Sequence, residues 1–217
     1  MYYLTHEIWF PEVTEASEEG LLAVGGDLSP ERLELAYRSG IFPWYSDGQP
    51  VLWWSPDPRM VMFPDKLYVS KSLRKKINRG NFRISFDQSF EEVIRNCAQV
   101  KRDDQAGTWI TDEMIDAYLL LNEKGIARSV EVWIEDRLVG GLYGIDLKEK
   151  AVFCGESMFS LMSDASKVAL YYLVEDLKAR GYKLIDCQMY TDHLASMGAE
   201  EISRERFLTY LIDTATT

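Results

Sequence analysis

Prolines crowd one stretch of this chain and limit what can form there. Five of them fall within residues 43–64, namely Pro43, Pro50, Pro56, Pro58 and Pro64. Proline fixes φ and lacks a backbone N–H, so it ends helices and interrupts the hydrogen bonding of central strands. We therefore expect only short elements here. We place a boundary in this stretch between a small N-terminal domain, residues 1–57, and a larger domain, residues 58–217.

Two adjacent tryptophans stand inside the proline-rich stretch, in the run LWWSPDPR at residues 52–59. Tryptophan buries a large apolar surface, so it is costly to expose to water and hard to bury in a turn. Trp53 and Trp54 therefore indicate either a packed corner between two lobes or the lip of a pocket that stacks flat ligands.

Charge and composition exclude several classes of protein. The formal net charge of −11 argues against a generic nucleic-acid binder. No apolar run approaches the ~18 residues that span a bilayer, and no secretory signal is visible, so we expect a cytoplasmic protein that does not enter the membrane. The three cysteines lie far apart, and there are only two histidines and no CxxC pair. This predicts reduced thiols and no metal site.

Beyond residue 65 the sequence pattern changes to longer elements. Caps and apolar spacing predict helices at 70–79, 87–100, 111–124, 163–180, 192–198 and 203–213, after one N-terminal helix between Ser29 and Gly40. Runs at 129–135, 137–146 and 151–159 predict an antiparallel meander, and 183–188 predicts a further strand after a crossover helix. The fold class is therefore α/β of the α+β type, with a mixed, partly antiparallel sheet.

One window of the acidic chain is strongly basic. Residues 66–86 contain seven Lys and Arg and no acid, whereas the rest of the chain has 17 basic and 35 acidic residues. Four of these cations, Lys71, Arg74, Lys75 and Arg79, have helical spacing. They form either a solvated helix face or a phosphate-binding patch, and the residues alone leave both open.

Three polar side chains stand at the ends of apolar runs. Glu156 closes one predicted strand, and Asp186 and Gln188 close another, with a spacing that places both on one face. They are either exposed strand ends or the polar groups of a binding site on an apolar wall. We expect His193 to be structural, because no nucleophile motif accompanies it, and Gly140-Gly141 opens no helix and so forms no phosphate loop.

Several aromatic residues lie beside turns or helix starts. Trp44 follows Phe42-Pro43, Trp109 precedes a predicted helix, and Tyr118 lies within that helix. Such aromatic side chains more often pack in a core or between lobes than stack on a ligand, and the sequence alone keeps both readings.

Eight short blocks occur in a fixed order: GLLAVGGDLSPERL, AYRSGIFPWY, WWSPDPR, GTWIT, SVEVW, FCGESMF, ASKVAL and LIDCQ...DHLASMGA. Together they closely resemble the leucyl/phenylalanyl-tRNA–protein transferases, bacterial enzymes of the N-degron pathway, from about residue 10 to residue 211. The resemblance implies transfer of leucine or phenylalanine, with methionine as a further donor, from aminoacyl-tRNA to proteins that begin with Arg or Lys. It also implies an N-acyltransferase-like larger domain and no need for a metal or coenzyme A.

The resemblance implies roles for individual residues. The pocket for the aminoacyl side chain falls on Leu142, Met158, Leu170, Leu173, Leu177 and Ile185, with Glu156 as its carboxylate. The residues that hold the 3′-terminal adenosine match Trp44, Trp109 and Tyr118. The basic cluster for tRNA matches Lys71, Arg74, Lys75, Lys76 and Arg79. The catalytic pair matches Asp186 and Gln188.

An aminoacyl ester is already activated, so its transfer needs mainly positioning, deprotonation of the amine and oxyanion stabilisation. Gln188 is not a strong base. We expect it to position the amine or stabilise the tetrahedral intermediate, with Asp186 orienting it and favouring the transient ammonium. We assign LWWSPDPR mainly to an interlobe corner that shapes the adenosine pocket, with Trp44 and Trp109 as the more direct contacts.

Two other functions remain open at this point. A coenzyme A-dependent N-acetyltransferase would share the fold, but the run from Arg137 to Leu142 is an incomplete pyrophosphate motif inside the meander. A non-catalytic RNA- or peptide-binding module would use the tryptophans and the basic window, but it would leave Asp186 and Gln188 without a role.

Overall fold

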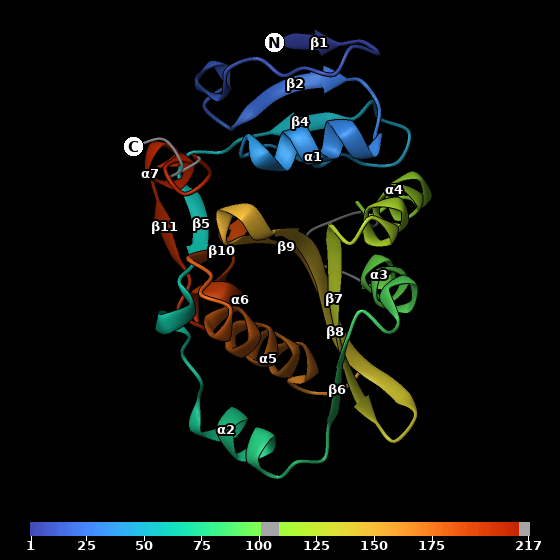
Figure 1. Cartoon of the computed structure of the whole chain (residues 1–217), viewed down its shortest axis with the longest axis vertical. Coiled ribbons are helices and arrows are strands. Elements are labelled where there is room, and N and C mark those ends of the chain that lie inside the picture. The colour runs from blue at the N-terminus through green and yellow to red at the C-terminus, as the bar shows by residue number, and fades with distance from the viewer. Residues whose placement is uncertain (101–108, 213–217) are drawn as a thin grey trace.

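The computed structural model describes residues 1–100 and 109–212 and contains two β-sheets. A four-stranded sheet with helix α1 lies at one end of the molecule, next to a seven-stranded sheet that carries the remaining helices (Figure 1). The strands of the first sheet end at Trp54, and those of the second begin at Arg59. The predicted domain division between residues 57 and 58 falls between the two sheets and stays a prediction.

The N-terminal sheet is built from short strands. They pair in the order β1-β2-β4-β3, with bounds β1 Tyr2–Leu4, β2 Leu21–Gly25, β3 Phe42–Pro43 and β4 Leu52–Trp54. Helix α1 (Pro30–Arg38) begins after Ser29 and is followed by Gly40, whose φ of +76° is left-handed. This helix was predicted and is confirmed. The proline-rich stretch holds no strand longer than four residues, as its prolines predict.

The seven-stranded sheet is mixed, in the order β11-β5-β10-β9-β8-β7-β6. The strand bounds are β5 Arg59–Met62, β6 Arg83–Phe86, β7 Ala127–Ile134, β8 Arg137–Leu147, β9 Val152–Ser160, β10 Leu184–Gln188 and β11 Glu200–Ile202. Strands β7, β8 and β9 form the antiparallel meander, and β10 joins β9 in parallel after a crossover helix. The predicted fold class is confirmed, whereas β5, β6 and β11 were not predicted.

The predicted helices of the larger domain are all present with shifted ends. Their bounds are α2 Lys71–Asn78, α3 Phe90–Gln99, α4 Asp112–Glu123, α5 Ala165–Ala179, α6 Asp192–Ala195 and α7 Arg204–Leu208. Helix α3 begins after Ser89 and not at Asp87, because Asp87 has a left-handed φ of +55°. Residue 213, the last of the helix predicted at 203–213, lies outside the described residues. No described helix is long and apolar enough to cross a bilayer.

Successive side chains along each strand point to opposite faces of the larger sheet, so the core is divided between the two faces. On β8, Leu142 packs in the cluster that contains α5, whereas Tyr143 packs in the cluster that contains α3 and α4. Figure 1 shows α3 and α4 on one side of the sheet and α5 on the other. The α3–α4 cluster also contains Trp53 of β4 and Leu33 of α1, so the two parts of the chain share a core.

The run LWWSPDPR forms a corner between the two sheets. Trp53 is fully buried, and its Nε1 donates to the carbonyl of Gly25 at 2.8 Å. Trp54 donates from Nε1 to the carbonyl of Trp44 at 2.7 Å. Arg204 of α7 donates to the carbonyl of Ser55 at 2.6 Å and so fastens the corner to the C-terminal helix. The run therefore links the two sheets, and its role as an interlobe corner that shapes the adenosine pocket stays a prediction.

Candidate active site

A cavity of about 460 Å³ opens in the larger sheet beyond the point where β9 and β10 stop pairing. These two strands pair only through residues 152–154 and 184–186, and residues 155–158 and 187–188 then line the cavity from both sides. The walls also include residues of β3, β8, α5 and α6. A largely apolar wall with a few polar groups is typical of a ligand site.

The apolar end of the cavity gathers most of the predicted pocket for the aminoacyl side chain. Five of its residues line the cavity together, namely Leu142, Met158, Leu170, Leu173 and Ile185. They come from β8, β9, α5 and β10, so the pocket exists only when the crossover helix lies against the sheet. Leu177 is fully buried in the core under α5 and does not line the cavity.

Two tryptophans form an aromatic part of the wall. Trp44 and Trp109 line the cavity, as the adenosine role requires. Trp54 stands behind Trp44, with ring centroids 5.7 Å apart, and supports it without lining the cavity. Tyr118 is fully buried and does not line the cavity, so it supports the site from behind its wall.

A chain of hydrogen bonds joins the N-terminal domain to the cavity. The hydroxyl of Tyr37, on α1, is hydrogen-bonded to the hydroxyl of Tyr118, and Tyr118 donates to Oε2 of Glu156 at 3.2 Å. The other oxygen of Glu156, Oε1, accepts from Nε2 of Gln188 at 3.1 Å. Both tyrosines are almost completely buried, so this chain fixes the carboxylate and the amide relative to both domains.

Burial raises the pKa of Glu156 to about 7, and the hydrogen bonds from Tyr37 and Tyr118 oppose that shift. The charge of Asp186 raises this pKa further, and the charge of Arg59 lowers it. The side chain thus loses and gains a proton near neutral pH, where a proton acceptor works best.

Gln188 faces the cavity with its amide already oriented. Because Nε2 donates to Glu156, the free position of the amide is the carbonyl oxygen Oε1, to which none of the described residues donates. The backbone φ of Gln188 is +58°, and the N–H of Met189 donates across it to the carbonyl of Cys187 at 2.7 Å. A left-handed turn at a residue with a Cβ costs on the order of 1–3 kcal/mol.

Asp186 lies behind Gln188 and does not line the cavity. It is 1% exposed, and its two oxygens accept from Nε and Nη2 of Arg59 at 2.8 and 2.7 Å. Its Oδ1 also accepts from the backbone N–H of Gln188 at 3.0 Å. The expected sharing of one strand face by Asp186 and Gln188 does not hold, because the register shifts between them. An exposed strand end is equally wrong for Asp186.

Two important partners, Arg59 and Tyr37, were missed by sequence reasoning. Each lies in a run that the resemblance includes, but no local pattern shows that Arg59 meets Asp186 or that Tyr37 meets Tyr118. His193 also lines the cavity, and burial lowers its pKa, with Lys167 adding to the effect. Its structural role stays a prediction.

No metal-binding group of three or more His, Cys, Asp or Glu occurs in the part of the chain that the structure describes.

The predicted tRNA cluster lies on α2 and its end, on the far side of the molecule from the N-terminal sheet (Figure 1). Lys71, Arg74, Lys75 and Arg79 are exposed. Lys76 is instead ion-paired with Asp164, at the start of α5. Leu73 anchors the helix in the core, so the exposed cations stand on a fixed helix face.

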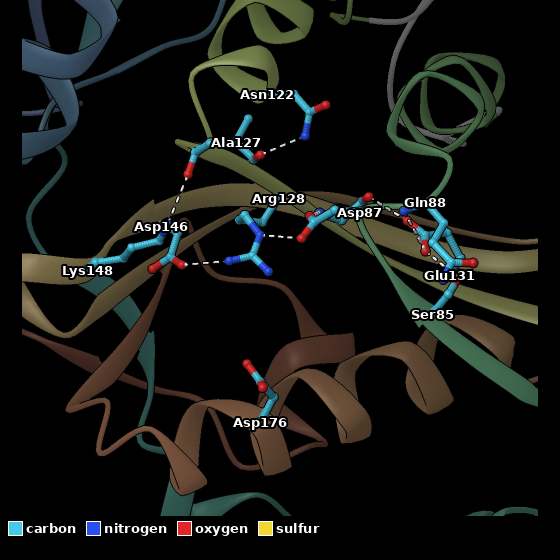
Figure 2. Close-up of polar contacts among 12 residues, drawn as sticks. Ser85, Asp87, Gln88, Asn122, Ala127, Arg128, Glu131, Asp146, Lys148 and Asp176 are labelled. Atoms are coloured by element: carbon cyan, nitrogen blue, oxygen red, sulfur yellow. Dashed lines mark hydrogen bonds and ion pairs between the residues drawn. The ribbon is translucent and has the colours of Figure 1, made fainter.

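A second group of charged residues lies at β7 and β8, where Arg128 meets Asp87 and Asp146 (Figure 2). Arg128 donates to Asp87 at 2.5 Å and to Asp146 at 3.4 Å, and Arg180 donates to Asp146 at 2.9 Å. The void among them is about 10 Å³, enough for one water molecule and not for a ligand. This group is therefore a structural network.

Comparison with known proteins decides the family. Residues 61–212 match the family model described as "Leucyl/phenylalanyl-tRNA protein transferase", and residues 26–57 match the model of its N-terminal domain. The chain belongs to this family. It is therefore an enzyme, an aminoacyltransferase.

Relatives match over almost their whole length. The leucyl/phenylalanyl-tRNA–protein transferase of Flavobacterium johnsoniae is 59% identical, over 97% of this chain and 99% of its own. That of Christiangramia forsetii is 58% identical, over 98% of this chain and 100% of its own. Among solved structures, the chain is similar to a GCN5-related N-acetyltransferase from Kribbella flavida, with 12% identity, a TM-score of 0.39, and 83% of this chain and 63% of that chain covered.

The raised pKa of Glu156 predicts a pH-dependent stability for this family member. Between about pH 4.5 and 7 the folded protein holds a proton that the unfolded chain releases, so stability falls as the pH rises. In Glu156→Gln, the free energy of unfolding should fall less over this pH range than in the wild type, by up to about 3 kcal/mol. Urea unfolding of both proteins at pH 5, 6, 7 and 8 measures the effect. Parallel stability curves would show that Glu156 is not protonated in the folded state.

Proposed function

We propose that this enzyme transfers leucine or phenylalanine from aminoacyl-tRNA to the α-amino group of proteins that begin with Arg or Lys. The carrying observation is one cavity in which an apolar pocket, two tryptophans and the oriented Glu156–Gln188 pair lie together. Family membership supports the same reaction. Because aminoacyl-tRNA is its donor, we place the reaction in the cytoplasm.

The apolar end of the cavity suits an unbranched or γ-branched side chain. Leucine, phenylalanine and methionine would fill the space between Leu170 and Leu173 of α5 and Met158 of β9. Trp44 and Trp109 would hold the terminal adenosine of the tRNA by stacking. The ester carbonyl would then lie between these two subsites, beside Gln188.

The attacking amine is then placed by Gln188. Its free Oε1 accepts a hydrogen bond from the neutral α-amine, which directs the nitrogen lone pair at the ester carbon. The new N–C bond forms, the amine proton passes to Glu156, and the ester C–O bond breaks. The departing ribose oxygen takes that proton back as the tRNA leaves. Both oxygens of Asp186 are bound to Arg59, so Asp186 acts on the reaction through Gln188 and not as the proton acceptor.

Charged residues in two places would favour the two substrates, with cations on α2 for the tRNA and an acid in the cavity for the acceptor N-terminus. The exposed cations Lys71, Arg74, Lys75 and Arg79 would contact phosphates of the tRNA body. Lys76, paired with Asp164, would contribute less. Among the described residues that line the cavity, Glu156 is the one acid, and the chain as a whole carries −11, which favours a cationic acceptor terminus.

The start of α5 argues against the coenzyme A alternative. A pyrophosphate site needs free backbone N–H groups at a helix N-terminus. Here the N–H of Ala165 donates to the carbonyl of Met162 at 3.0 Å, and that of Ser166 donates to the hydroxyl of Ser160 at 2.8 Å. Gly140 and Gly141 lie within β8, as expected, and form no phosphate loop.

A transfer assay tests the proposal directly. The enzyme is incubated with radiolabelled leucyl-tRNA and a peptide that begins with Arg, and peptide-bound label is measured. Matched peptides that begin with Glu, or whose N-terminus is acetylated, should remain unlabelled. Acetyl transfer from acetyl-coenzyme A to the Arg peptide, without leucyl transfer, would instead favour the N-acetyltransferase alternative. Binding of tRNA with no transfer would favour the binding module.

Blocking the apolar pocket should abolish the use of leucine. Leu170→Trp fills the space between α5 and β9, so leucyl transfer should fall by at least about 100-fold because the ester is displaced from Gln188. Tyr171→Trp is the matched control on the same helix, since Tyr171 does not line the cavity. Both variants should keep the wild-type circular dichroism spectrum. Unchanged transfer by a folded Leu170→Trp protein would remove α5 from the aminoacyl pocket.

The exposed cations of α2 should affect only donors that carry a tRNA body. Arg74→Ala with Arg79→Ala should weaken the binding of leucyl-tRNA and flatten its log–log salt dependence by roughly 0.7–0.9 per lost phosphate contact. The same pair of changes should leave transfer from leucyl-adenosine unaltered. Lys124→Ala with Lys148→Ala removes the same charge from another exposed region and serves as the control. Equal loss with both donors would place α2 at the reaction centre instead.

A further inference from the structure

Arg59 is an almost completely buried charge behind the cavity. It is 1% exposed, and its guanidinium lies 4.9 Å from the ring centre of Phe42 and 4.6 Å from that of Phe207. Its Nη1 donates to the carbonyl of Gly40 at 3.2 Å. These contacts come from β3, the end of α1 and α7, so elements from both ends of the chain fix the guanidinium in place.

The fixed guanidinium in turn fixes Asp186. Nε and Nη2 of Arg59 bind the two carboxylate oxygens in parallel at 2.8 and 2.7 Å, and this fork leaves the carboxylate a single orientation. In that orientation Oδ1 also receives the backbone N–H of Gln188 at 3.0 Å. A rotated carboxylate would lose this last bond.

The hydrogen bond from the backbone N–H of Gln188 to Asp186 holds the chain at a strained residue. Gln188 adopts φ +58°, and the turn around it closes through the N–H of Met189. A side chain in this conformation persists only where its surroundings enforce it, and such positions concentrate at functional sites. The turn is what directs the Gln188 amide to Glu156 and presents its carbonyl oxygen to the cavity.

We propose that Arg59 is a positioning residue, which acts through Asp186 to hold Gln188 in the strained turn that presents its amide to the attacking amine. The inference deepens the proposed function and rests on it for the role of the amide. The geometry distinguishes this role from simple charge neutralisation. A buried carboxylate could be neutralised by any cation, but only the fork of an arginine orients it.

Arg59→Lys separates these two roles. Lysine keeps the positive charge beside Asp186 but cannot bind both oxygens in parallel. We expect a folded protein whose kcat for leucyl transfer falls about 100-fold, the cost of a misplaced catalytic group, while KM for the acceptor peptide changes little. Arg128→Lys is the matched control, because Arg128 also bridges two aspartates but at the other polar cluster (Figure 2). It should keep the wild-type kcat.

A second variant excludes an effect of lost stability. Arg59→Met with Asp186→Leu replaces the ion pair by apolar side chains, so no unpaired charge stays buried and the protein should fold. It removes the acceptor for the Gln188 N–H, so kcat should again fall by about 100-fold. Wild-type kcat in this folded double variant, or in Arg59→Lys, would overturn the proposal.

Hydrogen exchange of the Gln188 backbone amide tests positioning without any transfer. Its protection should drop at least about tenfold in both Arg59 variants, because its carboxylate acceptor is displaced or absent. It should stay unchanged in Arg128→Lys. Unaltered protection in Arg59→Lys would contradict the role of Arg59. If the wild type transferred no leucine but the Arg59 variants still lost this protection, the positioning of Gln188 by Arg59 would stand and the proposed function would be rejected.

Discussion

The buried ion pair between Arg59 and Asp186 is the interaction on which the arrangement of the site depends. It joins β5 to β10 inside the larger sheet, and it reaches the N-terminal domain through Gly40 and Phe42 and the C-terminal helix through Phe207. Removing one partner of a buried pair costs on the order of 3–5 kcal/mol, because the other charge is left without compensation. Fold and site are therefore secured by the same contact.

This ion pair also makes the surroundings of Asp186 different from those of Glu156. Asp186 is bound on both oxygens, so it stays fixed behind the turn at Gln188. Among the described residues no cation is bonded to Glu156, and burial raises its pKa to about 7, which suits a group that takes up and returns a proton at neutral pH. Their surroundings therefore suit the two carboxylates to different tasks in the proposed reaction.

Much of the fold was predictable from local pattern, because capped helices and the meander repeat their signal over many residues. Strands β5, β6 and β11 were not, since three or four residues carry too little periodicity. The pocket residues came from the family resemblance. Neither local pattern nor the resemblance identified Arg59 and Tyr37 as site residues. Arg59 lies 127 residues from Asp186 and Tyr37 lies 81 residues from Tyr118, and folding alone brings them together.

In the proposed mechanism Glu156, and not Asp186, takes the proton of the amine that Gln188 positions. The pH dependence of kcat/KM for leucyl transfer, compared between the wild type and Glu156→Gln, tests this proton transfer, since kcat/KM reports groups of the free enzyme and free substrate. The α-amine of the acceptor titrates in the same way with both proteins, so the ratio of wild-type to variant kcat/KM isolates the contribution of Glu156. We expect the variant to be slower and this ratio to rise with pH around a midpoint of about 7. A ratio that does not change with pH would contradict the role of Glu156 as proton acceptor.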